Sequence, residues 1–195
     1  MNCYAILAVR PFEDGKSRLA DTLDFENRKK LNLNMFRHVV STIYELLPPA
    51  NVIVVSRSPT LLDEARHDGA HGIAERGEGL NQALTQGGEA ALQMGAASLL
   101  SVSSDLPLLR VDDLAAMLAE ESDVVIATDR ECVGTNAMLV RPPLAIPYLY
   151  GNNSLAAHRA AAAKHHLNTT IIHRPGLAHD LDTPSDLSDY LDLRV

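Results

Sequence analysis

The chain has no run of about 18 consecutive apolar residues, so it lacks a candidate for a membrane-spanning helix. Its first residues, 1–12, lack the basic region and the long apolar stretch of a targeting segment. Its two cysteines, Cys3 and Cys132, have neither a metal-type spacing nor the number that a disulfide framework needs. We therefore expect a soluble protein of the reducing cytoplasm that does not bind membranes.

Basic residues are scarce as well. Lysine and arginine number 17 against 25 aspartates and glutamates, which gives a net charge of −8. This charge argues against nucleic acid as the main partner and leaves small molecules, including anions held by local basic loops, as the expected ligands. No repeat, linker or low-complexity tract divides the sequence, and 195 residues suit a single α/β domain, residues 1–195. Whether the chain forms a homodimer is left open.

Short apolar runs alternate with stretches of helical pattern along the chain. The runs at 3–9, 51–56, 98–104 and 123–128 are bounded by polar or turn residues, as buried parallel strands are. Helical spacing of apolar residues covers 31–46, 80–94 and 111–121. The repeated β-α-β order predicts a mainly parallel, Rossmann-like sheet with helices on both faces. Ligands bind at the carboxyl ends of the strands in such sheets, so we expect the binding residues in the loops there.

The loop after the first strand is basic. It carries Arg10, Lys16 and Arg18, and Pro11 and Gly15 shape its turn. Such a loop suits the phosphates of a nucleotide, although it lacks the glycine spacing of a Walker P-loop. The alternative is a solvated basic turn.

Asp105 follows the apolar run at 98–104 and stands two residues before Pro107, which disfavours helix just before it. The position suits a carboxylate that binds Mg²⁺, because Mg²⁺ takes one or two carboxylates and fills its octahedron with water and substrate phosphates. The alternative is an ordinary turn aspartate.

The segment 176–190 contains four aspartates, which we interpret in two parts. Thr183 is placed to cap a helix that begins at Pro184, with Asp186 in the capping-box position, so Asp186 and Asp189 are expected to be structural.

Asp180 and Asp182 precede this cap. They alternate along an extended segment and therefore point to the same side. Two neighbouring carboxylates without a basic residue between them repel each other unless a cation binds. We therefore expect a metal site here.

Six motifs in the same order through nearly the whole chain resemble the 2-phospholactate guanylyltransferase family, which supplies the phosphorylated three-carbon side chain of the deazaflavin coenzyme called factor 420. The motifs are KSRL, GEGLNQAL, SSDLPLL, DRECVGTNAMLV, YGNNSLAAH and HDLDTPSDL. The resemblance implies a nucleotidyltransferase fold related to GT-A glycosyltransferases. The chain departs from the family at Arg10, where lysine is common, and at Tyr150, where phenylalanine is common.

The resemblance implies that the phosphate of a three-carbon acid attacks the α-phosphorus of GTP and releases pyrophosphate. Asp105, Asp180 and Asp182 are then expected to hold one or two Mg²⁺ ions. Arg10, Lys16 and Arg18 are expected to bind the triphosphate, with Lys16, Arg18 and Asp105 acting in the chemical step. The acceptor remains open among 2-phospholactate, phosphoenolpyruvate and 3-phosphoglycerate.

Two further loops supply candidates for the base and the acid. Gly79 permits close backbone approach, and Asn81, at a helix start, offers a donor and an acceptor to the nucleotide; the alternative for Asn81 is a purely helical role. Thr135 leads into a strand, and Gly151 and Ser154 open a helix with free N–H groups. By resemblance, these last three residues contact the phospho-acid, whereas His158, one turn inside that helix, is expected to be structural.

Three other classes remain as alternatives. A nucleotidyltransferase of the molybdopterin-guanylyltransferase or sugar-phosphate type shares the fold and the Mg²⁺, but GTNAML followed by GNNS matches the phospho-acid family better. A GT-A glycosyltransferase usually carries DxD at the central strand, where this chain has Asp-Leu-Pro at 105–107. A non-catalytic nucleotide-binding module would tolerate the loss of a carboxylate or a basic residue, and none is lost here.

Overall fold

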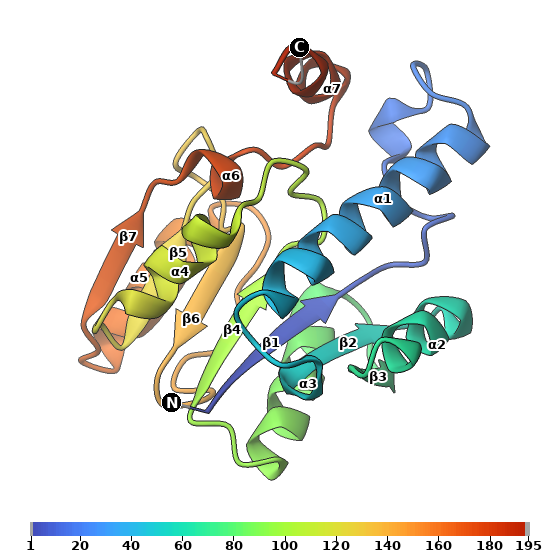
Figure 1. Cartoon of the computed structure of the whole chain (residues 1–195). Helices are drawn as coiled ribbons and strands as arrows, with labels where there is room; N and C mark the ends of the chain where they lie inside the picture. Colours follow the sequence, from blue (N-terminus) through green and yellow to red (C-terminus); the bar gives the residue numbers. More distant parts are fainter. Residues whose placement is uncertain (1, 194–195) are drawn as a thin grey trace.

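The computed structural model describes residues 2–193, which form a seven-stranded sheet in the order β3-β2-β1-β4-β6-β5-β7 (Figure 1). The strands are β1 (Cys3–Ala8), β2 (Val52–Ser56), β3 (His71–Ala74), β4 (Ser98–Val102), β5 (Val124–Ala127), β6 (Ala137–Val140) and β7 (Thr169–Ile172). β6 pairs antiparallel with β4 and β5, and all the other pairs are parallel. The predicted mainly parallel α/β fold is confirmed.

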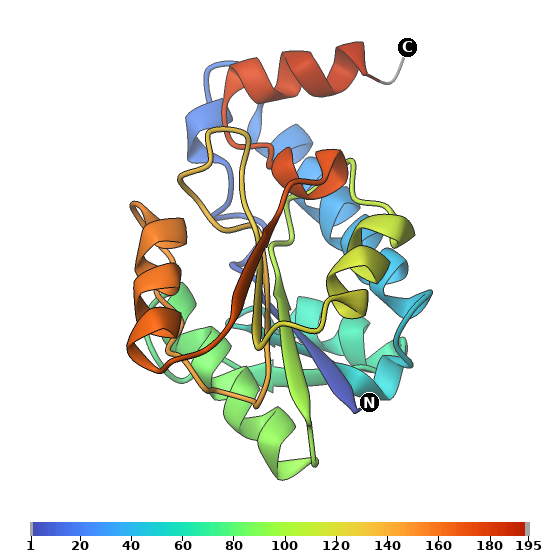
Figure 2. The same cartoon turned by 90° about the vertical axis from the view of Figure 1, so that its left-hand side faces the viewer.

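Helices cover both faces of the sheet (Figure 2). They are α1 (Phe25–Tyr44), α2 (Pro59–His67), α3 (Leu80–Gln93), α4 (Val111–Ala119), α5 (Ser154–Lys164), α6 (Pro175–Ala178) and α7 (Pro184–Asp192), with short 3-10 turns η1 (Ser17–Leu19) and η2 (Pro49–Asn51). Buried residues of α1, α2, α4 and α6 pack on one face, and those of α3 and α5 pack on the other.

The interior strand β1 shows why the sheet is covered by helices on both faces. Ala5 and Leu7 point into one core and Ile6 into the other, and all three are fully buried. Side chains alternate across a strand, so an uninterrupted apolar run fits only a sheet that is covered twice. Full burial of a leucine or isoleucine side chain stabilises the fold by roughly 2 kcal/mol.

The C-terminal helix α7 begins as the sequence predicts. Pro184 is its first residue, and Thr183 accepts a hydrogen bond from the Asp186 amide while the Asp186 carboxylate accepts one from the Thr183 amide. α7 stands off the sheet at the top of Figure 1 and is connected to it through a small separate core formed by Leu19, Met35 and Leu181. The helix start thus fixes the acidic segment that precedes it.

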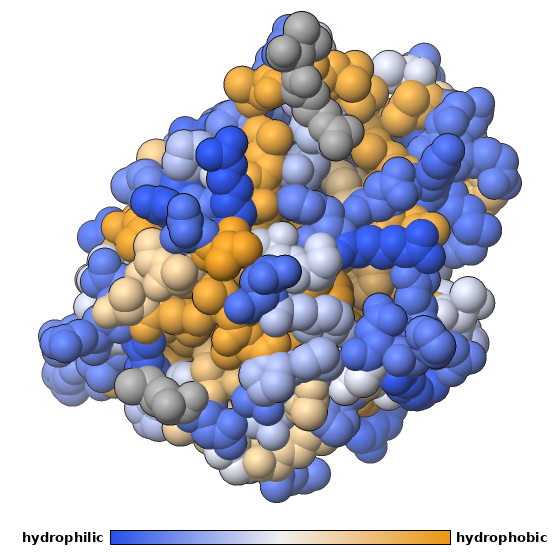
Figure 3. All heavy atoms as spheres, in the orientation of Figure 1, coloured by the Kyte–Doolittle hydropathy of each residue, from blue (hydrophilic) through white to orange (hydrophobic). Residues whose placement is uncertain are grey.

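The surface seen in Figure 3 carries hydrophilic atoms around its rim, with apolar atoms near α7 at the top and over a wider area in the middle and left of the view. Leu191 and Leu193, at the end of this helix, are among the exposed large apolar side chains. Within residues 2–193, no helix combines the length and apolar character that crossing a membrane requires.

Candidate active site

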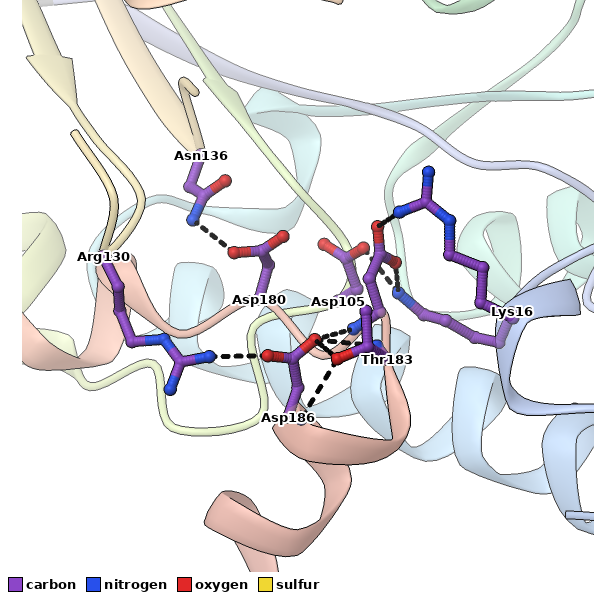
Figure 4. Close-up of polar contacts among 9 residues, drawn as sticks. Lys16, Asp105, Arg130, Asn136, Asp180, Thr183 and Asp186 are labelled. Carbon is purple, nitrogen blue, oxygen red and sulfur yellow. Dashed lines mark hydrogen bonds and ion pairs between the residues drawn. The ribbon is translucent and has the colours of Figure 1, made fainter. Parts of the chain in front are cut away.

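The basic loop after β1 places a lysine ammonium between two carboxylates (Figure 4). Lys16 adopts the left-handed backbone conformation, with φ 57°, where η1 begins. This conformation is uncommon for residues other than glycine, and it turns the side chain inward. Lys16 Nζ lies 2.7 Å from Asp105 Oδ2 and 2.6 Å from Asp182 Oδ1, and only 7% of the side chain is exposed. The loop after β1 is thereby joined to the end of β4 and to the acidic segment.

A backbone hydrogen bond sets the position of that acidic segment. The Leu181 amide donates to the Asp105 carbonyl oxygen at 3.1 Å, and the Leu181 side chain is buried. Because Leu181 points into the protein, its two neighbours point away from it. Asp180 lies beside Asp105 (Figure 4), and Asp182 shares the Lys16 ammonium with Asp105. Three aspartates from two distant parts of the sequence meet at the carboxyl end of β4.

The electrostatics of this group match its geometry. Burial raises the pKa of Asp180, and the charges of Asp105 and Asp182 raise it further, against an opposing hydrogen bond from Asn136 Nδ2 at 3.2 Å. Burial alone would lower the pKa of Lys16, but the two paired carboxylates outweigh it and raise that pKa. The site thus carries more negative charge than Lys16 neutralises, and it favours a further cation.

The carboxylates do not form a closed metal cage. Among residues 2–193, no group of three or more His, Cys, Asp or Glu side chains has the arrangement of a metal site. Their chemistry nevertheless fits Mg²⁺, which needs only one or two carboxylate oxygens and takes its other ligands from water and phosphate. The meeting of Asp105, Asp180 and Asp182 around the single ammonium of Lys16 is the observation of this structure that points to a further cation.

A cleft of about 620 Å³ opens beside the carboxylates. It follows the carboxyl edge of the sheet between α1 and α3. The loops after four neighbouring strands line it in the order in which the strands pair: Glu75 after β3, Arg57 after β2, Arg10 and Lys16 after β1, and Asp105 after β4. Gly79 and Asp182 also line the cleft, whose size is that of a small-molecule site.

Two of the predicted nucleotide ligands, Arg18 and Asn81, are not among the residues that line the cleft. The Arg18 side chain is largely exposed, with Nη1 3.9 Å from Asp182 Oδ2. Asn81 donates from Nδ2 to the Tyr150 carbonyl oxygen at 3.0 Å and accepts from the Tyr150 amide at 2.8 Å. As placed here, Asn81 holds the loop that carries Gly151, and its contact with a nucleotide stays a prediction. Gly79 has φ 89° at the start of α3, a conformation that favours glycine.

The predicted acid ligands Thr135 and Ser154 are buried near the starts of β6 and α5. Thr135 Oγ1 lies 3.1 Å from His158 Nδ1, while the Leu149 amide donates to His158 Nε2 at 2.8 Å. Both ring nitrogens of His158 are thus occupied, as its expected structural role requires. Burial lowers the pKa of His158 to about 4, so the ring is neutral. Gly151, exposed with φ 139°, precedes this buried group.

Asn136 was not among the predicted site residues. Its Nδ2 donates to the Leu177 carbonyl oxygen at 2.9 Å and to Asp180 Oδ1. Because β6 runs antiparallel, its first residues reach the same edge at which β4 ends, and this brings Asn136 to the aspartates. In the sequence, Thr135 and Asn136 form a polar pair directly before an apolar strand. This pair indicates a site residue only if the strand is known to run antiparallel to β4.

The remaining acidic residues have structural partners. Arg130, in the loop before β6, lies 2.5 Å from Asp186 Oδ1 and 2.6 Å from Asp189 Oδ2. This pair of contacts fastens α7 beside the site. The expected structural role of Asp186 in the capping box is thus seen together with a second contact that the sequence did not indicate.

Solved structures with similar folds are nucleotidyltransferases. A nucleotidyl transferase from Methanothermobacter thermautotrophicus superposes with a TM-score of 0.67 at 16% identity, covering 98% of both chains. A putative nucleotide-diphospho-sugar transferase from Desulfovibrio desulfuricans gives a TM-score of 0.76 at 15% identity, covering 97% of this chain and 86% of that one. At these identities the similarity shows the fold, and this fold is the predicted one.

Sequence relatives are more specific. Proteins named phosphoenolpyruvate guanylyltransferase from Rubrobacter xylanophilus and Sphaerobacter thermophilus are 40% and 37% identical, over 96% and 97% of this chain and 93% and 92% of theirs. A 3-phospho-D-glycerate guanylyltransferase from Colwellia psychrerythraea is 33% identical over 96% of this chain and 90% of its own. The model of the family described as "Guanylyl transferase CofC like" matches residues 3–192. The predicted resemblance is confirmed, the other nucleotidyltransferase types are not favoured, and the chain belongs to the CofC-like guanylyl transferase family.

Proposed function

We propose that this chain transfers GMP from GTP to phosphoenolpyruvate and releases pyrophosphate, in the synthesis of coenzyme factor 420. The observation that carries the proposal is the meeting of Lys16, Asp105 and Asp182 at one end of a nucleotide-sized cleft. Phosphoenolpyruvate is favoured over the other two acids because it is the acceptor in the names of the relatives at 40% and 37% identity.

The reaction needs no nucleophile from the protein. An oxygen of the acceptor phosphate, already ionised at neutral pH, forms a bond to the α-phosphorus of GTP. The bond from that phosphorus to the bridging oxygen breaks, and pyrophosphate leaves with the electron pair. The protein must align the two phosphates and neutralise their charge.

Basic residues of the loop after β1 supply part of that neutralisation. Arg10 and Lys16 line the cleft, and Arg18 lies beside Asp182 at its margin. Lys16 is held rigidly by its two short ion pairs, so its ammonium is already in place when a triphosphate enters. Phosphate oxygens then replace one or both carboxylates as its partners.

Asp105, Asp180 and Asp182 are the residues that would hold Mg²⁺, one or two ions. Bound there, Mg²⁺ would neutralise charge on the reacting phosphates and orient them. Asn136 fixes Asp180 by its hydrogen bond, so one carboxylate oxygen keeps a defined direction. The Leu181 amide, bonded to the Asp105 carbonyl oxygen, keeps the aspartates in register.

The acceptor is assigned to the side of the aspartates formed by β6 and the start of α5. Thr135, Gly151 and Ser154 belong to this region, and Asn136 connects it to Asp180. The hydroxyls of Thr135 and Ser154 are buried, so acid binding requires the loop around Gly151 to open, or the backbone amides there to make the contact.

The test incubates the purified protein with Mg²⁺, GTP and one of the three acids at a time, and measures the pyrophosphate that is released from GTP. Rapid release with phosphoenolpyruvate alone supports the proposal. Faster release with 3-phosphoglycerate or 2-phospholactate would reassign the acceptor and keep the reaction. No release with any of them would overturn the function.

A further inference from the structure

The end of the cleft away from the aspartates carries a carboxylate that the proposed reaction does not use. Glu75 follows β3, and its backbone is fixed by a hydrogen bond from its amide to the Ser56 carbonyl oxygen at 2.9 Å. Its side chain is only 9% exposed and lines the cleft. Within residues 2–193, the one polar partner given by the structure is Arg57 Nε, 3.4 Å from Oε2. A carboxylate so enclosed, with unused acceptor capacity, is suited to a ligand.

The order of the strands decides which part of a nucleotide reaches Glu75. The loops that carry Lys16 and Asp105 follow β1 and β4, whereas the residues that follow β2 and β3 include Arg57 and Glu75. Neighbouring strands lie about 4.8 Å apart, so β3 is roughly 14 Å from β4 along this edge. When the triphosphate lies at the Lys16 end, the base lies at the Glu75 end.

The surroundings of Glu75 also suit a flat base. Leu80 and Ala83 of α3 contribute apolar surface to the cleft, and Gly79 leaves it free of a side chain where the helix begins. The chemistry of guanine completes the match. Guanine carries two adjacent donors, N1–H and the 2-amino group, which one carboxylate accepts together. Adenine, cytosine and uracil do not present this pair.

We infer that Glu75 selects guanine by accepting hydrogen bonds from N1–H and the 2-amino group, with Arg57 as the residue that positions its carboxylate. This inference rests on the proposed use of GTP. It adds a specificity-determining residue at the opposite end of the cleft from the reacting phosphates. The Arg57 pair is partly exposed, so it orients Glu75 more than it stabilises the fold.

The decisive variant is Glu75→Gln. Glutamine keeps one acceptor and gains a donor, so it no longer matches guanine, but it matches xanthine, which has N1–H next to a carbonyl oxygen in place of the amino group. We expect the dissociation constant of GTP to rise by at least about tenfold, and the preference for GTP over XTP to fall by about 100-fold or more. ITP lacks the 2-amino group, so the wild type binds it more weakly than GTP, whereas Glu75→Gln binds the two alike.

Affinities of GTP, ITP, XTP and ATP are measured by calorimetry without any phospho-acid, so the outcome does not depend on turnover. Glu89→Gln, an exposed glutamate on α3 outside the cleft lining, controls for the loss of one charge and should keep the wild-type preferences. The melting temperature of each variant checks folding. If Glu75→Gln misfolds, Arg57→Gln serves instead and should weaken the preference for GTP over ITP while leaving ATP binding unchanged.

An unchanged preference for GTP over XTP in folded Glu75→Gln overturns the inference. Glu78 also lines the cleft. If Glu78→Gln gains XTP binding and Glu75→Gln does not, the inference is also overturned. Failure of the proposed function gives a different result. The wild type then releases no pyrophosphate from GTP with any of the phospho-acids, yet Glu75→Gln still changes which nucleotide binds most tightly.

Discussion

At the scale of single residues, the site consists of enclosed charges, each of which would destabilise the fold if its partners were absent. The Lys16 side chain is buried and paired twice, and Asp180 is partly buried beside two further carboxylates. Removing one partner from such a group ordinarily leaves a buried charge uncompensated and destabilises the protein. Because this group has more carboxylates than Lys16 neutralises, we expect the loss of the Asp105 charge to leave the protein folded.

Asp105→Asn should therefore abolish function without unfolding the protein. Asp182 still pairs with Lys16, and the repulsion that raises the pKa of Asp180 is reduced. We expect at least about a 100-fold loss of turnover, equivalent to roughly 2.7 kcal/mol of transition-state stabilisation. Weaker Mn²⁺ binding by spin-resonance titration and a nearly unchanged melting temperature should accompany it.

Asp63→Asn is the matched control, because its carboxylate is exposed on α2 and pairs only with the nearby Arg66 in the structure described here. It should match the wild type in turnover and in Mn²⁺ binding. Full turnover by Asp105→Asn would remove Asp105 from the metal site.

His158 makes stability depend on pH. Its pKa is about 4 in the folded protein, below its ordinary value of 6.5, because burial disfavours the charged ring. Below pH 6.5 the unfolded chain binds a proton that the folded chain does not, so folding stability falls as the pH is lowered from 6.5 to 4. The expected loss is up to about 3 kcal/mol.

Urea unfolding at a series of pH values tests this. His158→Gln should lose this part of the pH dependence, because glutamine can still accept from the Leu149 amide and donate to Thr135. His165→Gln, at an exposed position, should keep it. Equal curves for wild type and His158→Gln would contradict the assignment.

At the scale of elements, the start of α7 separates the structural aspartates Asp186 and Asp189 from Asp180 and Asp182, which we propose bind Mg²⁺. Thr183→Ala removes the side-chain cap of α7 and should lower the free energy of unfolding by about 1 kcal/mol. Asp182→Asn, one residue earlier, should instead abolish turnover with little change in stability. Urea unfolding and turnover are measured on both variants.

Ser188→Ala is the control for Thr183→Ala, because Ser188 is exposed in the middle of the same helix. Its stability should stay near that of the wild type. Intact turnover in Asp182→Asn would assign the whole acidic segment to helix capping.

At the scale of the whole molecule, the proposed nucleotide site is the cleft that follows the edge of the sheet. GTP with Mg²⁺ should contact loops from both halves of the sheet and bind only the folded chain. At 100 times its dissociation constant, a ligand stabilises the folded state by about 2.7 kcal/mol, which for a chain of this size raises the melting temperature by roughly 5–10 °C. Differential scanning calorimetry measures this shift.

The shift should be much smaller with Mg²⁺ alone and with ATP in place of GTP. An equal shift for ATP would mean that the cleft does not select the base. A shift from GTP that chelator leaves unchanged would mean that binding needs no divalent ion.

The sequence by itself determined the architecture and part of the site. Strands β1, β2, β4 and β5 are buried on both faces and therefore appear as apolar runs, and α7 is marked by its own local capping residues. Strands β3 and β7 went unpredicted, because as partly exposed edge strands they lack such runs. An apolar run predicts a strand that is buried on both faces, and capping residues predict a helix start, because neighbouring residues in the sequence produce both signals.

Only the tertiary structure decided how the site residues combine. The ion pairs of Lys16 join positions 89 and 166 residues away, and no spacing rule indicates such partners. The antiparallel direction of β6 brings Asn136 to Asp180, and the order of the strands puts Glu75 and Asp105 at opposite ends of one cleft. Strand order and direction depend on how the whole sheet packs. Two strands pair because together they bury apolar surface, and this does not depend on how far apart they lie in the sequence.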